Sequence, residues 1–418
     1  MEISTENKND HLLRIFTNLE FFCLCFLALM LPLLEAPKNI ASLLYLIVWV
    51  ARLATLGTHG LKKTSYDLII AVFLGGNIIA TIGAASKGYD TSDIVDIVRY
   101  SLIAWMLLHT TLSRKQILVL ISLLLLSALL GTAQGYWDLL QGNKHLFELH
   151  SVGHVNHSSI YLLLITGAIL PFMLNNKFSR WKKIITAISL LVLLLALFET
   201  NSRATFIGFV FILAVLFAVS MKHHRKLASL TFAIVVVFTV YSIWNTPPII
   251  NKFIAKSHAY GNQLKPREKL WNVAYAVWKK EPVFGIGYGS YKGINAQRLQ
   301  RWYKGSDIDF SDDSHYMYLS HAHNRYLHTL AEGGLIGLFS LLFLLAGATF
   351  VLWNQRTALQ RPGDRLSFWL VGFNTLSAIT IVGLFNTTLH HEHALLSMML
   401  LMLSYKAINL DVEEIHQT

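Results

Sequence analysis

Cationic and imidazole side chains recur at three places where a long apolar run meets a polar stretch. Arg203 lies in SRATFIGF, Arg267 lies in KPREKLWNVAYAVWKK, and several histidines lie in SHAHNRYLHTLAEGGLIGLF over residues 320–339. Arginine binds phosphate groups through paired hydrogen bonds and keeps its charge at every physiological pH. Histidine can act as a general base near neutral pH. These residue types predict an anion site with a base beside it.

The position of Arg267 favours an anion. Pro266 suits the first position of a helix, which places Arg267 in the first turn, where free backbone N–H groups already attract negative charge. An arginine gains nothing from the helix dipole at that end. The alternative is a surface arginine paired with Glu268 or with a lipid headgroup. For Arg203 the alternative is an anchor at the membrane interface, although such anchors are commoner on the cytoplasmic side.

The third stretch leads from a polar segment into an apolar run. On one continuous helix, five of its polar residues would share a face: His321, Asn324, Arg325, His328 and Glu332. His323 would lie on another face unless the helix begins after it. Polar side chains that enter a membrane span are costly and usually mark a site. The alternative is a solvated helix start with incidental histidines.

Two more histidine clusters lie elsewhere in the chain. His154 and His157 belong to VGHVNHSSIYL, and the second cluster consists of residues 390–393, HHEH. Histidine and carboxylate side chains can bind metals, but this spacing matches no established motif, so we predict no metal site. The first cluster could equally line an acceptor groove.

Two shorter patterns resemble motifs of other enzymes. Asp307 and Asp309 form a DxD pattern within SDIDFSDDSH, which also has the composition of an exposed polar turn. Gly285, Gly287 and Gly289 resemble a phosphate-binding loop, but no strand precedes them. We interpret these glycines as turns that return the chain to the membrane.

The composition indicates a membrane protein. Of the 418 residues, 54% are hydrophobic and 14% are charged, and the mean hydropathy is +0.48. Soluble domains carry about 25% charged residues. The net charge of +11 does not indicate nucleic-acid binding, because most Lys and Arg lie in short loops between apolar runs. Cys23 and Cys25 lie within the first apolar run, which excludes a disulfide framework.

The apolar runs predict an all-α integral membrane protein with about twelve spanning helices. The expected spans are 17–35, 40–57, 66–86, 96–112, 116–136, 158–175, 183–199, 204–221, 227–245, 332–352, 367–386 and 390–409. The excess of Lys and Arg in alternate loops predicts that both termini are cytoplasmic.

Four regions follow from these spans: 1–245 with nine helices, 246–331 as a large periplasmic loop, 332–409 with three helices, and a cytoplasmic tail at 410–418. The long loop is rich in Trp and Tyr, so we expect it to fold rather than to be disordered. Apolar residues at helical spacing after Pro266 predict an amphipathic interfacial helix, which Pro282 ends.

Three of these stretches, in this order and topology, resemble the bacterial O-antigen ligase family. They are SRATFIGF after a span, the arginine-containing helix leading into EPVFGIGYGSY, and HAHNRYLHTLAEGGLIGL leading into the next span. O-antigen polymerases and O-linking oligosaccharyltransferases belong to the same larger group, but VGHVNHSSIY is also similar to ligase sequences. The resemblance implies a fold like that of C-type glycosyltransferases.

The resemblance also implies an activity and its residues. A glycan would pass from undecaprenyl diphosphate to lipid A–core on the periplasmic face of the bacterial inner membrane, by inverting transfer without metal or cofactor. Arg203 and Arg267 would contact the diphosphate, and His323 would be the base. Weaker assignments are the possible substrate-binding residues His321, Asn324, Arg325, His154 and His157.

Two alternatives remain open. A polymerase of the same group would use the same arginines but would accept a second lipid-linked glycan. A transporter of lipid-linked glycans should show inverted repeats and interrupted spans at corresponding positions, which this sequence lacks. The sequence does not reveal the glycan, the acceptor sugar or the oligomeric state.

Overall fold

The computed structural model describes residues 2–58, 61–223, 264–360 and 362–416, and this part of the chain is helical without strands. Its α-helices are α1 (Glu2–Met30), α2 (Glu35–Leu56), α3 (Ser65–Ala85), α4 (Ile94–His109), α5 (Arg114–Leu140), α6 (Val155–Ile169), α7 (Arg180–Glu199), α8 (Arg203–His223), α11 (Pro266–Lys280), α12 (Ala296–Trp302), α13 (Arg325–Asn354), α14 (Asp364–Gly383) and α15 (His391–His416). Three short 3₁₀ helices are η1 (Leu170–Leu174), η2 (Tyr291–Gly293) and η3 (Arg356–Gln360).

Ten of the described helices are long and apolar enough to cross a membrane. The prediction of an all-α integral membrane protein is therefore confirmed. With α4, which has 16 residues, these helices correspond to the expected spans except 227–245, which lies outside the described residues. The first boundary differs, because α1 ends at Met30 rather than at 35. Pro32 has no N–H and restricts the residue before it, so the helix stops there.

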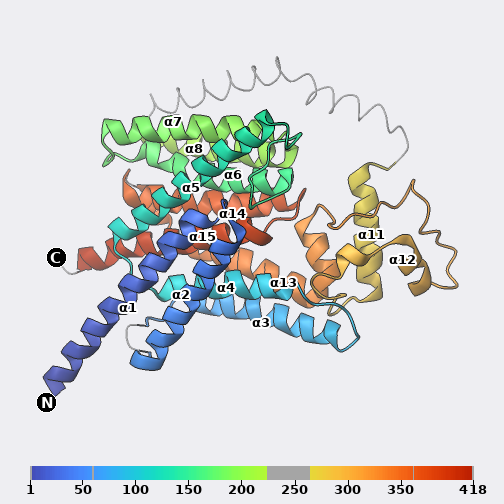
Figure 1. Cartoon of the computed structure of the whole chain (residues 1–418), viewed down its shortest axis with the longest axis horizontal. Coiled ribbons are helices and arrows are strands. Elements are labelled where there is room, and N and C mark those ends of the chain that lie inside the picture. The colour runs from blue at the N-terminus through green and yellow to red at the C-terminus, as the bar shows by residue number, and fades with distance from the viewer. Residues whose placement is uncertain (1, 59–60, 224–263, 361, 417–418) are drawn as a thin grey trace.

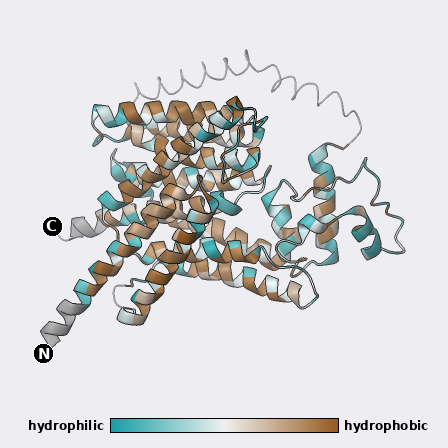
Figure 2. Cartoon of the chain, in the orientation of Figure 1, coloured by the Kyte–Doolittle hydropathy of each residue, from teal (hydrophilic) through white to brown (hydrophobic). Residues whose placement is uncertain are grey.

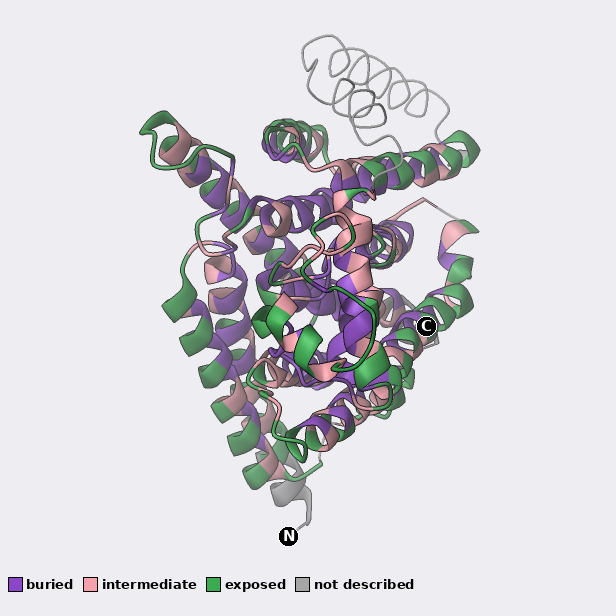
Figure 3. Cartoon of the chain, turned by 90° about the vertical axis from the view of Figure 1, so that its right-hand side faces the viewer, coloured by how far each residue is buried: buried purple, intermediate pink, exposed green. Residues whose placement is uncertain are grey.

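Three helices form the centre of the bundle. The most apolar windows of α6 with η1, α14 and α15 are 83%, 78% and 78% buried, whereas the other candidate spans are 28–44% buried. Figure 3 shows buried residues in the middle of the molecule and exposed residues on its outer helices. Helix α14 packs against α15, α8 and α6, and α15 also packs against α4.

The two ends of the bundle differ in character. Both termini lie at one end, and α11 and α12 lie at the opposite end, where α11 runs across the direction of the long helices (Figure 1). The long helices are mainly hydrophobic, whereas the α11–α12 region is largely hydrophilic (Figure 2). That region has its own apolar core, which includes Val273, Val277, Leu299 and Phe310. The α11–α12 region thus packs around apolar residues of its own.

A loop of glycines follows α11 and packs against α13. The glycine loop, residues 282–289, packs against a break in α13 at Gly334, whose φ is 62° and ψ is −161°. Four backbone hydrogen bonds cross this junction: Ile286 N to Ala331 O at 3.1 Å, Gly287 N to Glu332 O at 2.8 Å, Leu335 N to Pro282 O at 2.9 Å and Ile336 N to Val283 O at 3.2 Å. The loop thereby satisfies groups that the broken helix leaves free.

Candidate functional site

Two arginines approach each other at the end of the bundle that carries α11. Arg203 is the first residue of α8, and Arg267 lies in the first turn of α11. Burial lowers the pKa of Arg267, and the nearby positive charge of Arg203 lowers it further. The carboxylate of Glu268 accepts from Lys265 N at 2.8 Å, at the start of the same helix. No described carboxylate forms an ion pair with Arg267, so the arrangement suits an external anion.

His323 lies in the segment before α13, within range of the charge of Arg267. Its Nδ1 is 3.3 Å from Asn386 Oδ1, and its side chain is part-buried. Burial lowers the pKa of His323, a hydrogen bond from its imidazole to Asn386 Oδ1 opposes this, and the charge of Arg267 lowers the pKa further. The imidazole is therefore neutral at pH 7, which is the form that a general base requires.

The expectation that His321 shares a helical face with the polar residues of α13 is wrong. The helix begins only at Arg325, because Asn324 caps it: Asn324 Oδ1 accepts from Tyr326 N and Leu327 N, both at 3.0 Å. Asparagine satisfies the free N–H groups of a first turn well, so the helix starts after it. His321 and His323 both precede the helix. His323 has a positive φ of 47°, which is uncommon for a residue other than glycine.

The sequence analysis missed the segment between α14 and α15. This linker, residues 384–390, touches several of the predicted site residues. Leu384 O accepts from Asn324 Nδ2 at 3.1 Å, and the ring centroid of Phe385 is 5.8 Å from Arg267 Cζ. Asn386 faces His323. The only sequence signal is a run of polar residues, Asn-Thr-Thr, directly after an apolar span.

The histidine clusters at residues 154–157, 321–328 and 390–393 form a single group in the structure. Its members are His154, His157, His321, His328, His390, His391 and His393. His157 Nδ1 and His393 Nε2 are 2.8 Å apart, and the ring centroids of His321 and His390 are 5.0 Å apart. Burial lowers the pKa of His321 to about 4. Among the described residues, no three His, Cys, Asp or Glu side chains are placed to hold one metal ion.

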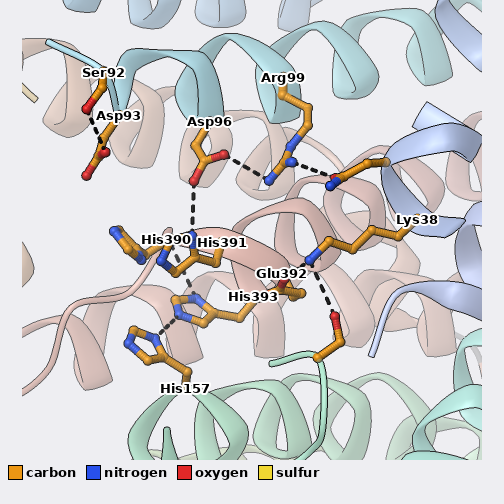
Figure 4. A network of polar contacts seen from close by, with 12 residues as sticks. Lys38, Ser92, Asp93, Asp96, Arg99, His157, His390, His391, Glu392 and His393 are labelled. Atoms are coloured by element: carbon orange, nitrogen blue, oxygen red, sulfur yellow. Dashed lines mark hydrogen bonds and ion pairs between the residues drawn. The ribbon is translucent and has the colours of Figure 1, made fainter. Parts of the chain in front are cut away.

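Ion pairs fix the first turn of α15 beside these imidazoles (Figure 4). Lys38 of α2 pairs with Glu392, and His391 Nδ1 is 3.0 Å from Asp96 Oδ2 of α4. Asp96 also pairs with Arg99 at 2.9 Å. The HHEH stretch therefore ties three helices together at this end of the bundle.

The polar residues of α13 itself point into the bundle. Arg325 is 6% exposed and lines a cavity of about 20 Å³ with His328 and Glu332. Glu332 Oε1 accepts from Gly289 N at 3.0 Å and from Tyr291 N at 3.1 Å, so this carboxylate holds the end of the glycine loop. A larger cavity of about 290 Å³ lies at the opposite end of the bundle and includes none of the predicted site residues.

His154, Asp307 and Asp309, which the sequence analysis singled out, lie at the surface. His154 caps α6, where its Nδ1 accepts from Asn156 N at 3.2 Å, and its side chain is exposed. Asp307 and Asp309 are exposed, and Asp309 Oδ1 accepts from Ser311 N at 2.9 Å. The DxD pattern is thus part of a polar turn.

Backbone strain concentrates around the same site. The described residues other than glycine with positive φ are Asn201, His323, Leu389 and His391. Asn201 lies two residues before Arg203, and His323 is the predicted base. Leu389 and His391 lie where the linker meets α15. Such conformations cost about 1–3 kcal/mol each and gather at functional sites.

The fold and the site define a multi-pass helical membrane protein with two arginines and a neutral histidine at one end of its bundle. Residues 188–342 match the model of a family described as O-antigen ligase. The matched segment covers less than half of the chain, is similar to that family, and includes Arg203, Arg267 and His323. The family supports ligase-type or polymerase-type glycosyl transfer, with a lipid-linked glycan and a lipid acceptor. No curated protein matches the chain.

Proposed function

We propose that this protein is an O-antigen ligase of the bacterial inner membrane. It transfers a glycan from undecaprenyl diphosphate to lipid A–core on the periplasmic face, and both of its termini are cytoplasmic. The observation that carries this proposal is that the charge of Arg267 acts on His323 and is itself affected by the charge of Arg203, although the three residues come from segments far apart in the chain.

The two arginines bind the diphosphate of the donor. Arg267 feels the positive charge of Arg203, so an anion that contacts both guanidinium groups is attracted by two charges. Each guanidinium can form paired hydrogen bonds to phosphate oxygens. As the bond from the anomeric carbon to the diphosphate breaks, negative charge grows on the leaving group, and one well-placed donor stabilises such charge by about 3 kcal/mol.

His323 activates the acceptor. An acceptor hydroxyl attacks the anomeric carbon from the side opposite the diphosphate, and its proton passes to the imidazole, so the reaction inverts the anomeric centre. The diphosphate leaves as a stabilised anion and requires no general acid. His321, His154 and His157 lie beside His323 and are candidate contacts to the acceptor sugar. Asn324 and Arg325 instead hold the local fold and the bundle interior.

The proposal is tested by complementation of a Gram-negative strain that lacks its ligase and supplies a matching core and glycan. The readout is the ladder of core-attached polysaccharide on a gel, with the membrane level of each variant checked. We expect a ladder with the wild type. His323→Ala should reduce transfer by about 10²–10⁴-fold. Arg203→Gln or Arg267→Gln should reduce it by about 10²–10³-fold.

Matched controls come from the same side of the bundle. His145→Ala changes an exposed histidine and Arg301→Ala changes an exposed arginine of α12, and both should retain the wild-type ladder. A ladder that survives His323→Ala would exclude this base. If the wild type is well expressed but gives no ladder, and the lipid-linked chains become longer, the protein is a polymerase instead.

A further inference from the structure

We propose that Asn386 is a positioning residue, which sets the tautomer of His323 and leaves Nε2 as the basic nitrogen. This inference rests on the proposed function, since it assigns His323 as the base. Asn386 is 3% exposed and lies between α14 and α15, which are both central helices of the bundle. Its amide is therefore held rigidly.

The backbone identifies which atom of the amide faces the imidazole. Thr387 N donates to Asn386 Oδ1 at 2.9 Å, and a backbone N–H can only donate. The atom at that position is therefore an oxygen that accepts. His323 Nδ1 lies 3.3 Å from the same oxygen, so Nδ1 carries the hydrogen. In the neutral ring the lone pair is then on Nε2.

The remaining nitrogen is available to a substrate. No described residue forms a hydrogen bond to His323 Nε2, and the side chain is only part-buried. When the acceptor oxygen bonds to the anomeric carbon, the hydroxyl proton moves to Nε2, and the electron pair of the broken bond leaves on the diphosphate. The ring becomes an imidazolium, and its Nδ1–H bond to Asn386 strengthens because the donor is now charged.

A neutral partner suits this site better than a carboxylate. No described carboxylate lies within ion-pair distance of His323. The titratable groups that act on it are Arg267 of α11, His154 and His157 at the start of α6, His321 of its own segment and His328 of α13. A carboxylate at position 386 would weaken the attraction of the arginines for the donor diphosphate and would favour a protonated base. The amide fixes the tautomer without adding charge.

The test uses the full-length protein in proteoliposomes with lipid-linked glycan and lipid A–core, and it measures the transfer rate against pH. The rate rises with pH as His323 loses its proton. Asn386→Asp keeps an acceptor oxygen but adds a negative charge, which should raise the pH of the half-maximal rate by about 1–3. At high pH this variant should retain a rate within about tenfold of the wild type.

Two further variants complete the test. Asn386→Ala should reduce the rate by about 10–100-fold across the pH range, which is typical of losing a partner that orients a functional imidazole. Asn295→Asp, at the exposed cap of α12, adds the same charge on the same side of the bundle and should leave the profile unchanged. The thermal midpoint of each variant separates loss of fold from loss of the tautomer.

Each outcome has a distinct meaning. An Asn386→Asp profile that coincides with the wild type, or an Asn386→Ala variant with full activity, would overturn the role of Asn386. If His323→Ala is inactive in the same assay, such a result refutes the positioning role and leaves the proposed function intact. If His323→Ala is fully active, the assignment of the base itself has failed.

Discussion

Replacing Gly285 by alanine should lower the stability of the protein more than the addition of one methyl group suggests. Gly285 has a φ of +68°, where an L residue costs about 1–2 kcal/mol. The new Cβ would also overlap the carbonyl of Glu332 and lie 2.6 Å from Gly333 N. These are backbone atoms of α13 that cannot move aside, so overpacking adds about 1–3 kcal/mol. We expect a total loss of about 2–5 kcal/mol.

Gly305 supplies the matched control. It also has a positive φ, of +90°, and lies in the same region between α12 and α13, but a Cβ there would meet nothing within 4 Å. Gly305→Ala should therefore lose only the conformational part, about 1–2 kcal/mol. The assay is the temperature at which purified protein in detergent loses half of its folded signal, followed by the transfer rate at a lower temperature.

The expected order of thermal midpoints is wild type, Gly305→Ala and then Gly285→Ala. The transfer rate should fall only for Gly285→Ala, since the glycine loop holds α11, which carries Arg267, against α13, which directly follows the segment of His323. Equal losses of stability for the two variants would refute the argument from packing. A normal transfer rate of the Gly285→Ala variant would refute the proposed dependence of transfer on the glycine loop.

Three other predictions concern the base, a buried ion pair and metals. Burial lowers the pKa of His323, so the base stays deprotonated at neutral pH. The transfer rate should therefore fall only below about pH 6.5. A rate that is already half-maximal above pH 7 would contradict this prediction. Arg52 and Glu20 form a buried ion pair at 3.2 Å, so Glu20→Gln alone should lower the stability of the protein by about 3–5 kcal/mol. The double variant Glu20→Gln with Arg52→Met should lose less, because no unpaired charge stays buried. Thermal unfolding would compare the two variants, and equal losses of stability would argue against this account. Because two arginines neutralise the diphosphate, transfer should survive EDTA, and a loss that Mg²⁺ restores would count against their role.

Local patterns predicted most of the fold. The apolar runs indicated the described spans because a helix that crosses a membrane needs about 20 apolar residues, whatever it packs against. Pro266 indicated the start of α11 because proline fits a first helical position, and the structure begins the helix there. The expected span began at 332, whereas α13 begins at Arg325, because Asn324 caps the helix there.

Long-range contacts could not be predicted in the same way. Asn386 meets His323 across 63 positions, and His157 meets His393 across 236. These contacts depend on how α6, α14 and α15 pack, and no local spacing encodes that packing. The pairing of Arg52 with Glu20 also depends on the contact between α1 and α2. Sequence analysis therefore identified residue types for the site but not the residues that orient them.

The glycine loop has a consequence for biosynthesis. Helix α11 leaves the ribosome before α13, so the backbone groups of residues 331–336 that hold the loop do not yet exist when Arg267 emerges. Asn386 and Phe385 arrive later still, after α14. A nascent chain that stops before residue 320 contains both arginines but neither the base nor the linker that contacts it. The proposed site is therefore complete only after the final helices have been inserted.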